Sequence, residues 1–207
     1  MERSFAIALV ISMLSVVFGL MAGYALATLP FKGRRLYFIL VIGVLLVPFP
    51  SIMVAVFIMT QKLGLVDTYL GVIVPGALSP LGVFLMRQYL LRLPKEMVEA
   101  ARIDGANEFR IFVQLIVPLS WPVISAVAVL TFVASWNNLL WPLIVLSQPA
   151  HYTMPLALTE FNSVNATDYV GIVAMSVVAI APIVILFLLS RRRLLDSIML
   201  SGGGVVG

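Results

Sequence analysis

The sequence predicts an all-α fold, a polytopic transmembrane helical bundle. Of its 207 residues, 62% are hydrophobic and 11% are charged, and the mean hydropathy is +1.12. A soluble globular domain is about 45–50% apolar and about 25% charged. Long uncharged runs, separated by short charged segments, recur along the chain. Because lipid cannot satisfy exposed backbone groups, runs of this length indicate helices that cross a membrane.

Residues 5–29 form the first predicted span. This run contains 25 residues and no charged side chain. At about 1.5 Å per residue it reaches roughly 37 Å, enough to cross a hydrocarbon core of about 30 Å with some tilt. A cleaved signal peptide is the alternative, but its apolar region is typically about 7–15 residues long, and here a second apolar run follows at once. We therefore predict a retained span.

Four further spans are predicted, at about residues 36–60, 70–91, 123–143 and 169–189. Pro48 and Pro50 remove backbone donors from the second span, and we favour a structural kink there over a gating role. Small residues in the third span predict close packing against other helices. The uncharged run from Ile111 to Ser147 is too long for one span, so its first part is expected to lie along the membrane surface before Pro118.

A charged block separates the third and fourth spans. The stretch from Pro94 to Pro118 holds seven of the chain's 22 acidic and basic residues, between apolar runs on both sides. Its pattern predicts two short helices joined by a turn, which we call the elbow (residues 94–116). Pro94 suits the first helical position, and Glu99 and Arg102, three residues apart, can pair on the polar side of the first helix.

The turn of the elbow is marked by two residues. Gly105 permits the positive φ that often ends a helix, and Asn107 can cap the helix that follows. The second helix is expected to carry an apolar stripe made of Phe109, Phe112, Val113 and Ile116.

The basic residues predict the orientation of the bundle. With the elbow inside, only Arg3 and Lys62 lie on the outer side. The inner side then holds the other eleven: Lys32, Arg34, Arg35, Arg87, Arg92, Lys95, Arg102, Arg110 and Arg191–Arg193. This asymmetry predicts an outer N-terminus and a cytoplasmic C-terminus. Because the positive charge lies beside membrane segments, we expect membrane lipid as a partner and no nucleic acid.

Several kinds of chemistry are absent from the sequence. It contains no G-x-x-x-x-G-K-[ST] motif, since the glycines at 202–204 lack the lysine, and no H-E-x-x-H motif. With no cysteine, it has no disulfide or thiolate ligand. The single histidine, His151, is expected to be a solvated residue of an outer loop. We predict no catalytic residue, no metal site and no enzyme activity.

A polar cluster interrupts the fourth predicted span. Trp136, Asn137 and Asn138 lie toward its outer half. Amides in hydrocarbon are unfavourable, so they are expected to face the bundle interior or a water-filled path. An aromatic ring beside amides can hold a sugar, with the ring on C–H groups and the amides on hydroxyls. The predicted role is a translocation path, and the equally weighted alternative is hydrogen bonding between helices with interfacial anchoring by the tryptophan.

At the elbow the sequence resembles a known family. Glu99-Ala100-Ala101, then Gly105, then Leu115-x-Val117-Pro118 is similar to the EAA loop of binding-protein-dependent ABC importer permeases, and most of the chain resembles their carbohydrate-uptake, maltose-type branch. The resemblance implies a type I ABC importer permease core, with residues 1–207 forming one transmembrane permease domain and 190–207 a cytoplasmic tail. It implies that the elbow docks into a groove of the ATPase subunit. The implied coupling residues are Glu99, Ala100, Ala101, Asp104, Gly105, Ala106, Phe112 and Pro118.

The same resemblance implies the partners and the mechanism. An ATPase subunit dimer would use ATP and Mg, this chain would bind no cofactor, and a second permease subunit and an extracytoplasmic solute-binding protein would complete the importer. The elbow would pass the motion of the ATPase to the third and fourth spans, giving alternating access. Without the motif, the chain could instead be a non-transporting membrane scaffold or a channel subunit.

The sequence departs from the family at several places, conservatively at Leu115 and Val117, where members usually have Ile and Leu. Asn138 stands where the family usually has a carboxylate. The chain begins just before what would be the family's second span, so it is either a minimal importer core or lacks an upstream segment. The tail from Ser201 to Gly207 resembles the family's C-terminal segment, which reaches the ATPase interface, but it has Val206 where many members carry a basic residue. A frayed tail is the alternative.

Overall fold

The computed structural model describes residues 1–160, 171, 173–186 and 188. Within these residues the secondary structure is helical throughout, with no strand, which confirms the predicted all-α class. The helices form two compact units, which we describe separately. Among the described residues, unit 1 contains residues 1–13, 47–77 and all those from 129 onward. Unit 2 contains residues 14–46 and 78–128.

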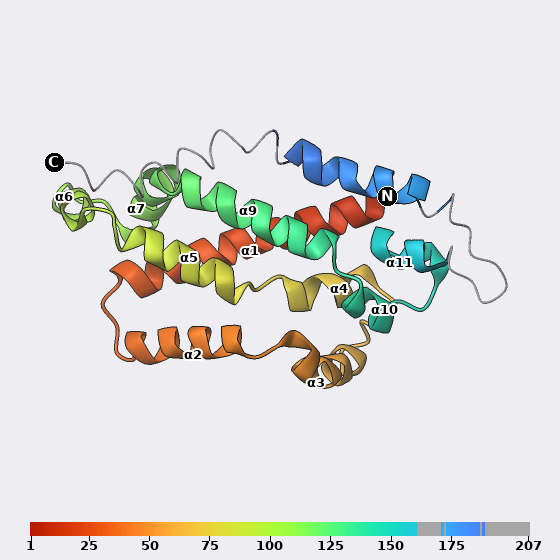
Figure 1. Cartoon of the computed structure of the whole chain (residues 1–207). Helices are drawn as coiled ribbons and strands as arrows, with labels where there is room; N and C mark the ends of the chain where they lie inside the picture. The colour runs from red at the N-terminus through yellow and green to blue at the C-terminus, as the bar shows by residue number, and fades with distance from the viewer. Residues whose placement is uncertain (161–170, 172, 187, 189–207) are drawn as a thin grey trace. The chain divides into compact units, whose positions relative to one another are not determined.

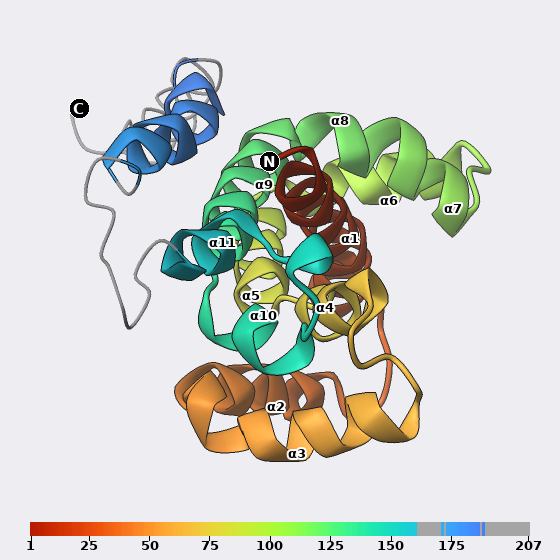
Figure 2. The same ribbon diagram turned by 90° about the vertical axis from the view of Figure 1, so that its right-hand side faces the viewer.

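Unit 2 contains the elbow and the helices that hold it. Its elements are the second part of α1 (Glu2–Thr28), α2 (Arg34–Leu46), α5 (Pro80–Leu90), α6 (Lys95–Ile103), α7 (Glu108–Ile111), the π-helical turn η1 (Phe112–Ile116), α8 (Val117–Leu119) and the first part of α9 (Trp121–Trp136). Helices α6 and α7 lie side by side in both views (Figures 1 and 2).

The core of unit 2 is built where α1, α5 and the elbow meet. Its buried residues are Leu20, Tyr24, Met86, Leu90, Val98, Ile111, Ile116, Val123, Ile124 and Val127. Helices α1 and α5 approach closely at Gly23, where a Cβ atom would lie 2.7 Å from the Cβ atom of Met86. A glycine is therefore required for this helix crossing.

Unit 1 contains the remaining elements. They are the first part of α1, α3 (Phe49–Lys62), α4 (Tyr69–Gly76), the end of α9, α10 (Leu140–Val145), the 3₁₀ turn η2 (Pro149–His151), α11 (Met154–Glu160) and an apolar helix over Val173–Leu186. Helix α10 packs against α4 and α3 (Figure 2). Trp141 lies in the core between them, with its indole N–H donating to the carbonyl oxygen of Gly71 at 3.0 Å.

Three of the predicted spans are interrupted. The second predicted span divides into α2 and α3 at Pro48, which has extended backbone (φ −61°, ψ 130°). The third divides into α4 and α5, and the Ser79 hydroxyl caps α5 by accepting from the backbone N–H of Gly82. The fourth is interrupted after Trp136, where α9 ends, and continues as α10. Proline and polar residues thus break these apolar runs.

Length and composition identify the helices able to cross a bilayer. Within the described residues, α1 and the segment Tyr69–Leu90 are each long and apolar enough to cross a bilayer. Two bent helix pairs also pass the test if each pair is taken as one span, so the number of possible spans is two to four. The predicted number and ends of the spans stay predictions. The structure describes only part of the last predicted span, 169–189. The predicted tail, 190–207, which includes Ser201 to Gly207, lies outside the described residues.

Candidate functional site

The elbow begins with helix α6. Its residues from Lys95 onward are good helix formers, and Pro94 takes the capping position just before them rather than the predicted first helical position. The helix ends at Ile103 with Asp104 as its C-cap, and Gly105 makes the turn with a φ of +80°. This positive φ, which favours glycine, was predicted from the sequence and is confirmed.

The second half of the elbow starts at a side-chain cap. The Asn107 Oδ1 atom accepts from the backbone N–H of Arg110 at 2.8 Å, so the predicted cap is confirmed. The helix then widens into the π-turn η1 and continues to Leu119. At Ser120 the chain bends by 75° into α9. The elbow therefore has its own direction, distinct from that of the helix that follows it, and π-turns are often found at functional sites.

The elbow is closed by a carboxylate bridge centred on Glu108. Arg102 Nε donates to Glu108 Oε1 at 2.8 Å, which ties α6 to α7. The hydroxyl of Tyr24, from α1, donates to Glu108 Oε2 at 2.6 Å. The predicted pairing of Arg102 with Glu99 is replaced by this bridge, because the turn at Gly105 brings Glu108 within reach of the guanidinium.

The bridge sets the charge states of its polar members. The hydrogen bond from Arg102, together with that from Tyr24, lowers the pKa of Glu108 below its ordinary value. The Glu108 carboxylate in turn raises the pKa of Arg102. Both side chains are more than a third exposed, so solvent weakens this pair relative to a buried one.

The apolar side of the second elbow helix matches the predicted stripe only in part. Phe109 is 75% exposed and Val113 is 45% exposed, whereas Ile111 and Ile116 are buried in the core. Ile116 is thus buried as predicted and Phe112 is partly buried, so the stripe is confirmed in part. The π-turn lets Ile111, five residues before Ile116, share the buried side. Ile103 on α6 is 86% exposed as well. The elbow thus presents large apolar side chains outward.

The predicted coupling residues fall on two sides of the elbow. Glu99, Ala100, Asp104, Gly105 and Pro118 are exposed, whereas Ala101, Ala106 and Phe112 are partly buried against the core of unit 2. A groove of about 300 Å³ runs along the elbow. It is lined by Met97, Ala100, Ala101, Asp104, Ala106, Arg110, Ile111, Gln114 and Leu115. Small residues in this groove would let another backbone approach closely.

The glutamate of the EAA sequence lies beside a second hollow. Glu99 lines a pocket of about 180 Å³ together with Arg34, Lys95 and Arg102 and with apolar residues from the ends of α1 and α5. The carboxylate therefore lies among basic side chains at the junction of the elbow and the helices.

The predicted translocation residues lie in unit 1 at the end of α9. Trp136 is 2% exposed, its ring stacks on Phe132 at 6.0 Å between centroids, and its indole N–H donates to the carbonyl oxygen of Ala179 at 3.0 Å. Asn138 Oδ1 accepts from the backbone N–H of Trp141 at 3.3 Å, while Asn137 is exposed. Only the Trp136 contact joins two helices, whereas that of Asn138 is local, three residues along the chain. The roles of these residues stay predictions.

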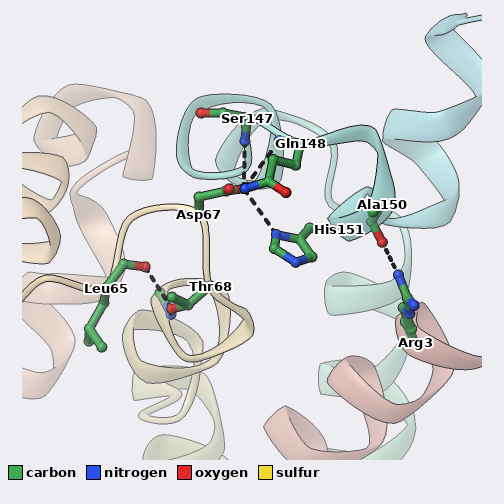
Figure 3. A network of polar contacts seen from close by, with 9 residues as sticks. Arg3, Leu65, Asp67, Thr68, Ser147, Gln148, Ala150 and His151 are labelled. Carbon is green, nitrogen blue, oxygen red and sulfur yellow. Dashed lines mark hydrogen bonds and ion pairs between the residues drawn. The ribbon is translucent and has the colours of Figure 1, made fainter.

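A second polar network joins two loops of unit 1 (Figure 3). Asp67 Oδ1 accepts from the backbone N–H groups of Ser147 at 2.9 Å and Gln148 at 3.2 Å, and lies 3.1 Å from Nδ1 of His151. The Asp67 backbone N–H donates to the carbonyl oxygen of Val145. The Ser147 N–H, with His151 and Gln148, lowers the pKa of Asp67 to about 2.

His151 is therefore not the simply solvated residue that the sequence predicts. Its ring is partly buried, edge-on to Tyr69 at 5.4 Å between centroids, and bound to Asp67. Arg3 donates to the carbonyl oxygen of Ala150 next to it. Among the residues that the structure describes, no group of three or more acidic, histidine or cysteine side chains could hold a metal ion.

Sequence reasoning missed Tyr24 and Asp67 as organising residues. Tyr24 is the one tyrosine in the first apolar run, which is a signal that could have directed attention to it. Asp67 has a φ of +58°, and its partners lie about 80 residues away, so no local pattern identifies them.

Comparison with known proteins gives a family for nearly the whole chain. Residues 5–198 match the family described as "Binding-protein-dependent transport system inner membrane component". The arabinooligosaccharides transport system permease protein AraQ of Halalkalibacterium halodurans is 44% identical over 97% of this chain and 71% of its own length. AraQ of Bacillus subtilis is 40% identical over 99% of this chain and 72% of its own length.

A solved structure supports the same fold. The chain resembles a component of a bacterial ABC transporter involved in the import of the acidic polysaccharide alginate, with a TM-score of 0.75 and 23% identity. The match covers 92% of this chain and 74% of that one.

Proposed function

Because the chain belongs to the family of binding-protein-dependent transport system inner membrane components, we propose that it is the carbohydrate-conducting permease subunit of an ATP-binding-cassette importer. The multi-pass membrane character follows from the family and from the apolar helices. The carbohydrate assignment is supported by the two AraQ proteins, which match nearly the full chain. Two partners follow from this proposal: a solute-binding protein delivers the sugar, and a second permease subunit completes the pathway.

The exposed surface of the elbow carries this proposal. Among the described residues, Ile103 and Phe109 are two of the most exposed large apolar side chains, and they project from a charged segment rather than from an apolar span. Exposed apolar side chains rimmed by polar ones are typical of a protein interface. The neighbouring groove, lined by Ala100, Ala101 and Ala106, has small residues where a partner backbone could fit. We assign this surface to the ATPase subunit.

The orientation follows from the charge distribution. An ATPase works in the cytoplasm, so the elbow must be cytoplasmic, and the excess of Lys and Arg on the same side agrees with this requirement. With the elbow in the cytoplasm, we propose that the N-terminus of the chain lies outside the cell membrane and the C-terminus lies in the cytoplasm. Asp67 and His151 would lie in outer loops, on the side from which the solute-binding protein approaches.

The mechanism is alternating access driven by a separate ATPase. ATP and Mg are bound by that partner, and this chain contributes no residue to hydrolysis. The elbow acts as one rigid piece, because the Gly105 turn is closed by the bridge between Arg102 and Glu108. Its displacement reaches α9 through η1 and α5 through residues 91–94. Packed helices switch between discrete arrangements rather than deforming continuously, so the spans rearrange together.

The translocation path is proposed to pass the end of α9. Asn137 is exposed and can offer its amide to a sugar hydroxyl. Trp136 and Asn138 would support the wall of the path without contacting the sugar, since the indole N–H of Trp136 and the amide oxygen of Asn138 are already hydrogen-bonded. Loss of the carboxylate usual in the family at position 138 would make this part of the path uncharged.

Two substitutions in the elbow test the coupling role. Glu99→Lys reverses the charge at the EAA glutamate, and Gly105→Pro cannot adopt the φ of +80°. We expect both variants to insert and to lose ATP-driven uptake into vesicles. Glu96→Lys, the same charge change outside the predicted coupling set, should keep uptake. Normal uptake by Glu99→Lys or Gly105→Pro, with the protein present in the membrane, would contradict the coupling role.

Co-purification separates this function from a scaffold or a channel subunit. A permease should bring down an ATPase subunit and a second permease, whereas a scaffold or channel need not. Sugar binding by the cognate solute-binding protein, measured by calorimetry, would identify the substrate. Failure of that protein to bind any carbohydrate would refute the substrate class while leaving the importer assignment intact.

A further inference from the structure

We propose that Glu108 is a positioning residue that fixes the elbow to helix α1, so that displacement of the elbow also moves α1. The proposal rests on the function above and adds to it a mechanical path that does not follow the chain. The elbow is covalently continuous with α5 and α9 only. Its link to α1 is made by side chains, and Glu108 accepts the hydrogen bond that Tyr24 of α1 donates.

Each oxygen of the Glu108 carboxylate binds a different element. Oε1 accepts from Arg102 on α6 at 2.8 Å, and Oε2 accepts from Tyr24 on α1 at 2.6 Å, while Glu108 itself belongs to α7. One side chain therefore joins both elbow helices to α1. Hydrogen bonds to a charged group are shorter and stronger than those between neutral groups, and the two distances here are in that short range. Such bonds fix both the distance and the relative orientation of the two groups.

The receiving end of the bridge is embedded in the core. Tyr24 is 5% exposed, and its ring packs against Phe112 of η1 at 5.5 Å between centroids. The preceding residue, Gly23, brings α1 against α5 at Met86, which is fully buried. Force applied to the Tyr24 hydroxyl thus enters a tightly packed pair of helices rather than a loose side chain.

The covalent route out of the elbow is less direct. Between Glu108 and α9 the chain passes through the π-turn η1 and the 75° bend at Ser120. The other covalent connection is the short non-helical segment before α6. Apolar contacts are non-directional and allow neighbouring surfaces to slide, whereas the bridge holds the elbow in one register on α1. The bridge is therefore suited to making elbow and α1 move as one body.

Tyr24→Phe is the sharpest test, because it removes only the hydroxyl and keeps the ring against Phe112. We expect the purified importer to assemble and hydrolyse ATP, but to transport roughly five-fold less sugar, or less still, per ATP hydrolysed, since one hydrogen bond to a carboxylate is lost. Glu108→Gln, which keeps the side-chain size and removes the charge, should show the same defect. Tyr37→Phe, at an exposed tyrosine of α2, is the matched control and should behave as wild type.

A distance measurement distinguishes positioning from general destabilisation. Spin labels at Met21→Cys on α1 and Val113→Cys on the elbow occupy exposed positions, and the chain has no cysteine of its own. In the otherwise wild-type chain, this distance should be the same with and without bound ATP. In the Tyr24→Phe background it should change on ATP binding, because the elbow then moves without α1.

Three outcomes would overturn the proposal. They are wild-type transport per ATP in Tyr24→Phe, a labelled distance that already changes with ATP in the wild-type background, and a distance that stays constant in Tyr24→Phe. Each would leave the proposed importer function standing. Absence of ATP-driven uptake by the wild-type complex would instead refute the proposed function, and this inference with it.

Discussion

Replacing Gly23 by alanine should force α1 and α5 apart. The new Cβ atom would lie 2.7 Å from Cβ of Met86 and 3.0 Å from the backbone nitrogen of Arg87. Carbon atoms pack best at about 3.5–4.0 Å, so the contact with Met86 is short by roughly 1 Å. Both atoms belong to the α5 backbone or are attached directly to it, and no side-chain rotation can move them away. The helices themselves must separate.

The size of the effect follows from a comparison with Gly43→Ala. Overpacking of a close contact typically costs about 1–3 kcal/mol. Glycine to alanine in a helix also gains up to about 1 kcal/mol from helix propensity, and this gain is common to both positions. A Cβ atom at Gly43, on α2, would meet nothing within 4 Å. The free energy of unfolding of Gly23→Ala should therefore be lower than that of Gly43→Ala by about 1–3 kcal/mol.

Reversible unfolding of the purified chain in mixed micelles, followed by tryptophan fluorescence, measures this difference directly. Gly43→Ala should equal or slightly exceed wild type. If Gly23→Ala proved as stable as Gly43→Ala, α1 and α5 would not meet closely at this residue. The packed helix pair invoked for the Glu108 bridge would then be wrong as well.

Two further predictions concern the loops and the elbow. Asp67 has a pKa of about 2 in the folded chain, below the unfolded value of about 3.9, so its stabilising contribution is complete above about pH 4 and disappears as the pH falls toward 2. Wild type should therefore lose more stability than Asp67→Asn between pH 5 and pH 2 in thermal unfolding, and equal losses would contradict the Asp67 network. Phe109→Ser removes a 75% exposed ring, so the isolated chain should keep its stability while the ATPase subunit co-purifies less well; unchanged recovery of the ATPase would remove Phe109 from the docking surface.

The elbow was largely predictable because its signals are local. Gly105 at a positive φ and Asn107 as a cap depend on the chemistry of single residues and their immediate neighbours, and both predictions are confirmed. The apolar stripe was predicted only in part: Ile116 is buried and Phe112 is partly buried, but Val113, inside the π-turn at Phe112–Ile116, is exposed. Phe109 precedes the π-turn and is exposed, although the stripe placed it inward.

The candidate site needed contacts between distant residues. Tyr24 and Glu108 are 84 positions apart, and Asp67 and His151 are also 84 apart, so neither pairing follows from spacing. Trp136 and Asn138 could serve a path or a structural role by composition alone. Only their neighbours show that the indole N–H and the amide oxygen are already bound in this conformation.

By itself the sequence determined the class of protein, a helical membrane protein whose most charged segment is a turn between apolar runs, because hydrocarbon allows few ways to satisfy a backbone. The tertiary structure alone decided which partners the charged and aromatic groups of that turn choose. Arg102 could pair with Glu99 on its own helix, yet in the fold it binds Glu108. Glu108 also accepts a hydrogen bond from Tyr24 of α1. That choice depends on how helices pack in three dimensions, which no local pattern records.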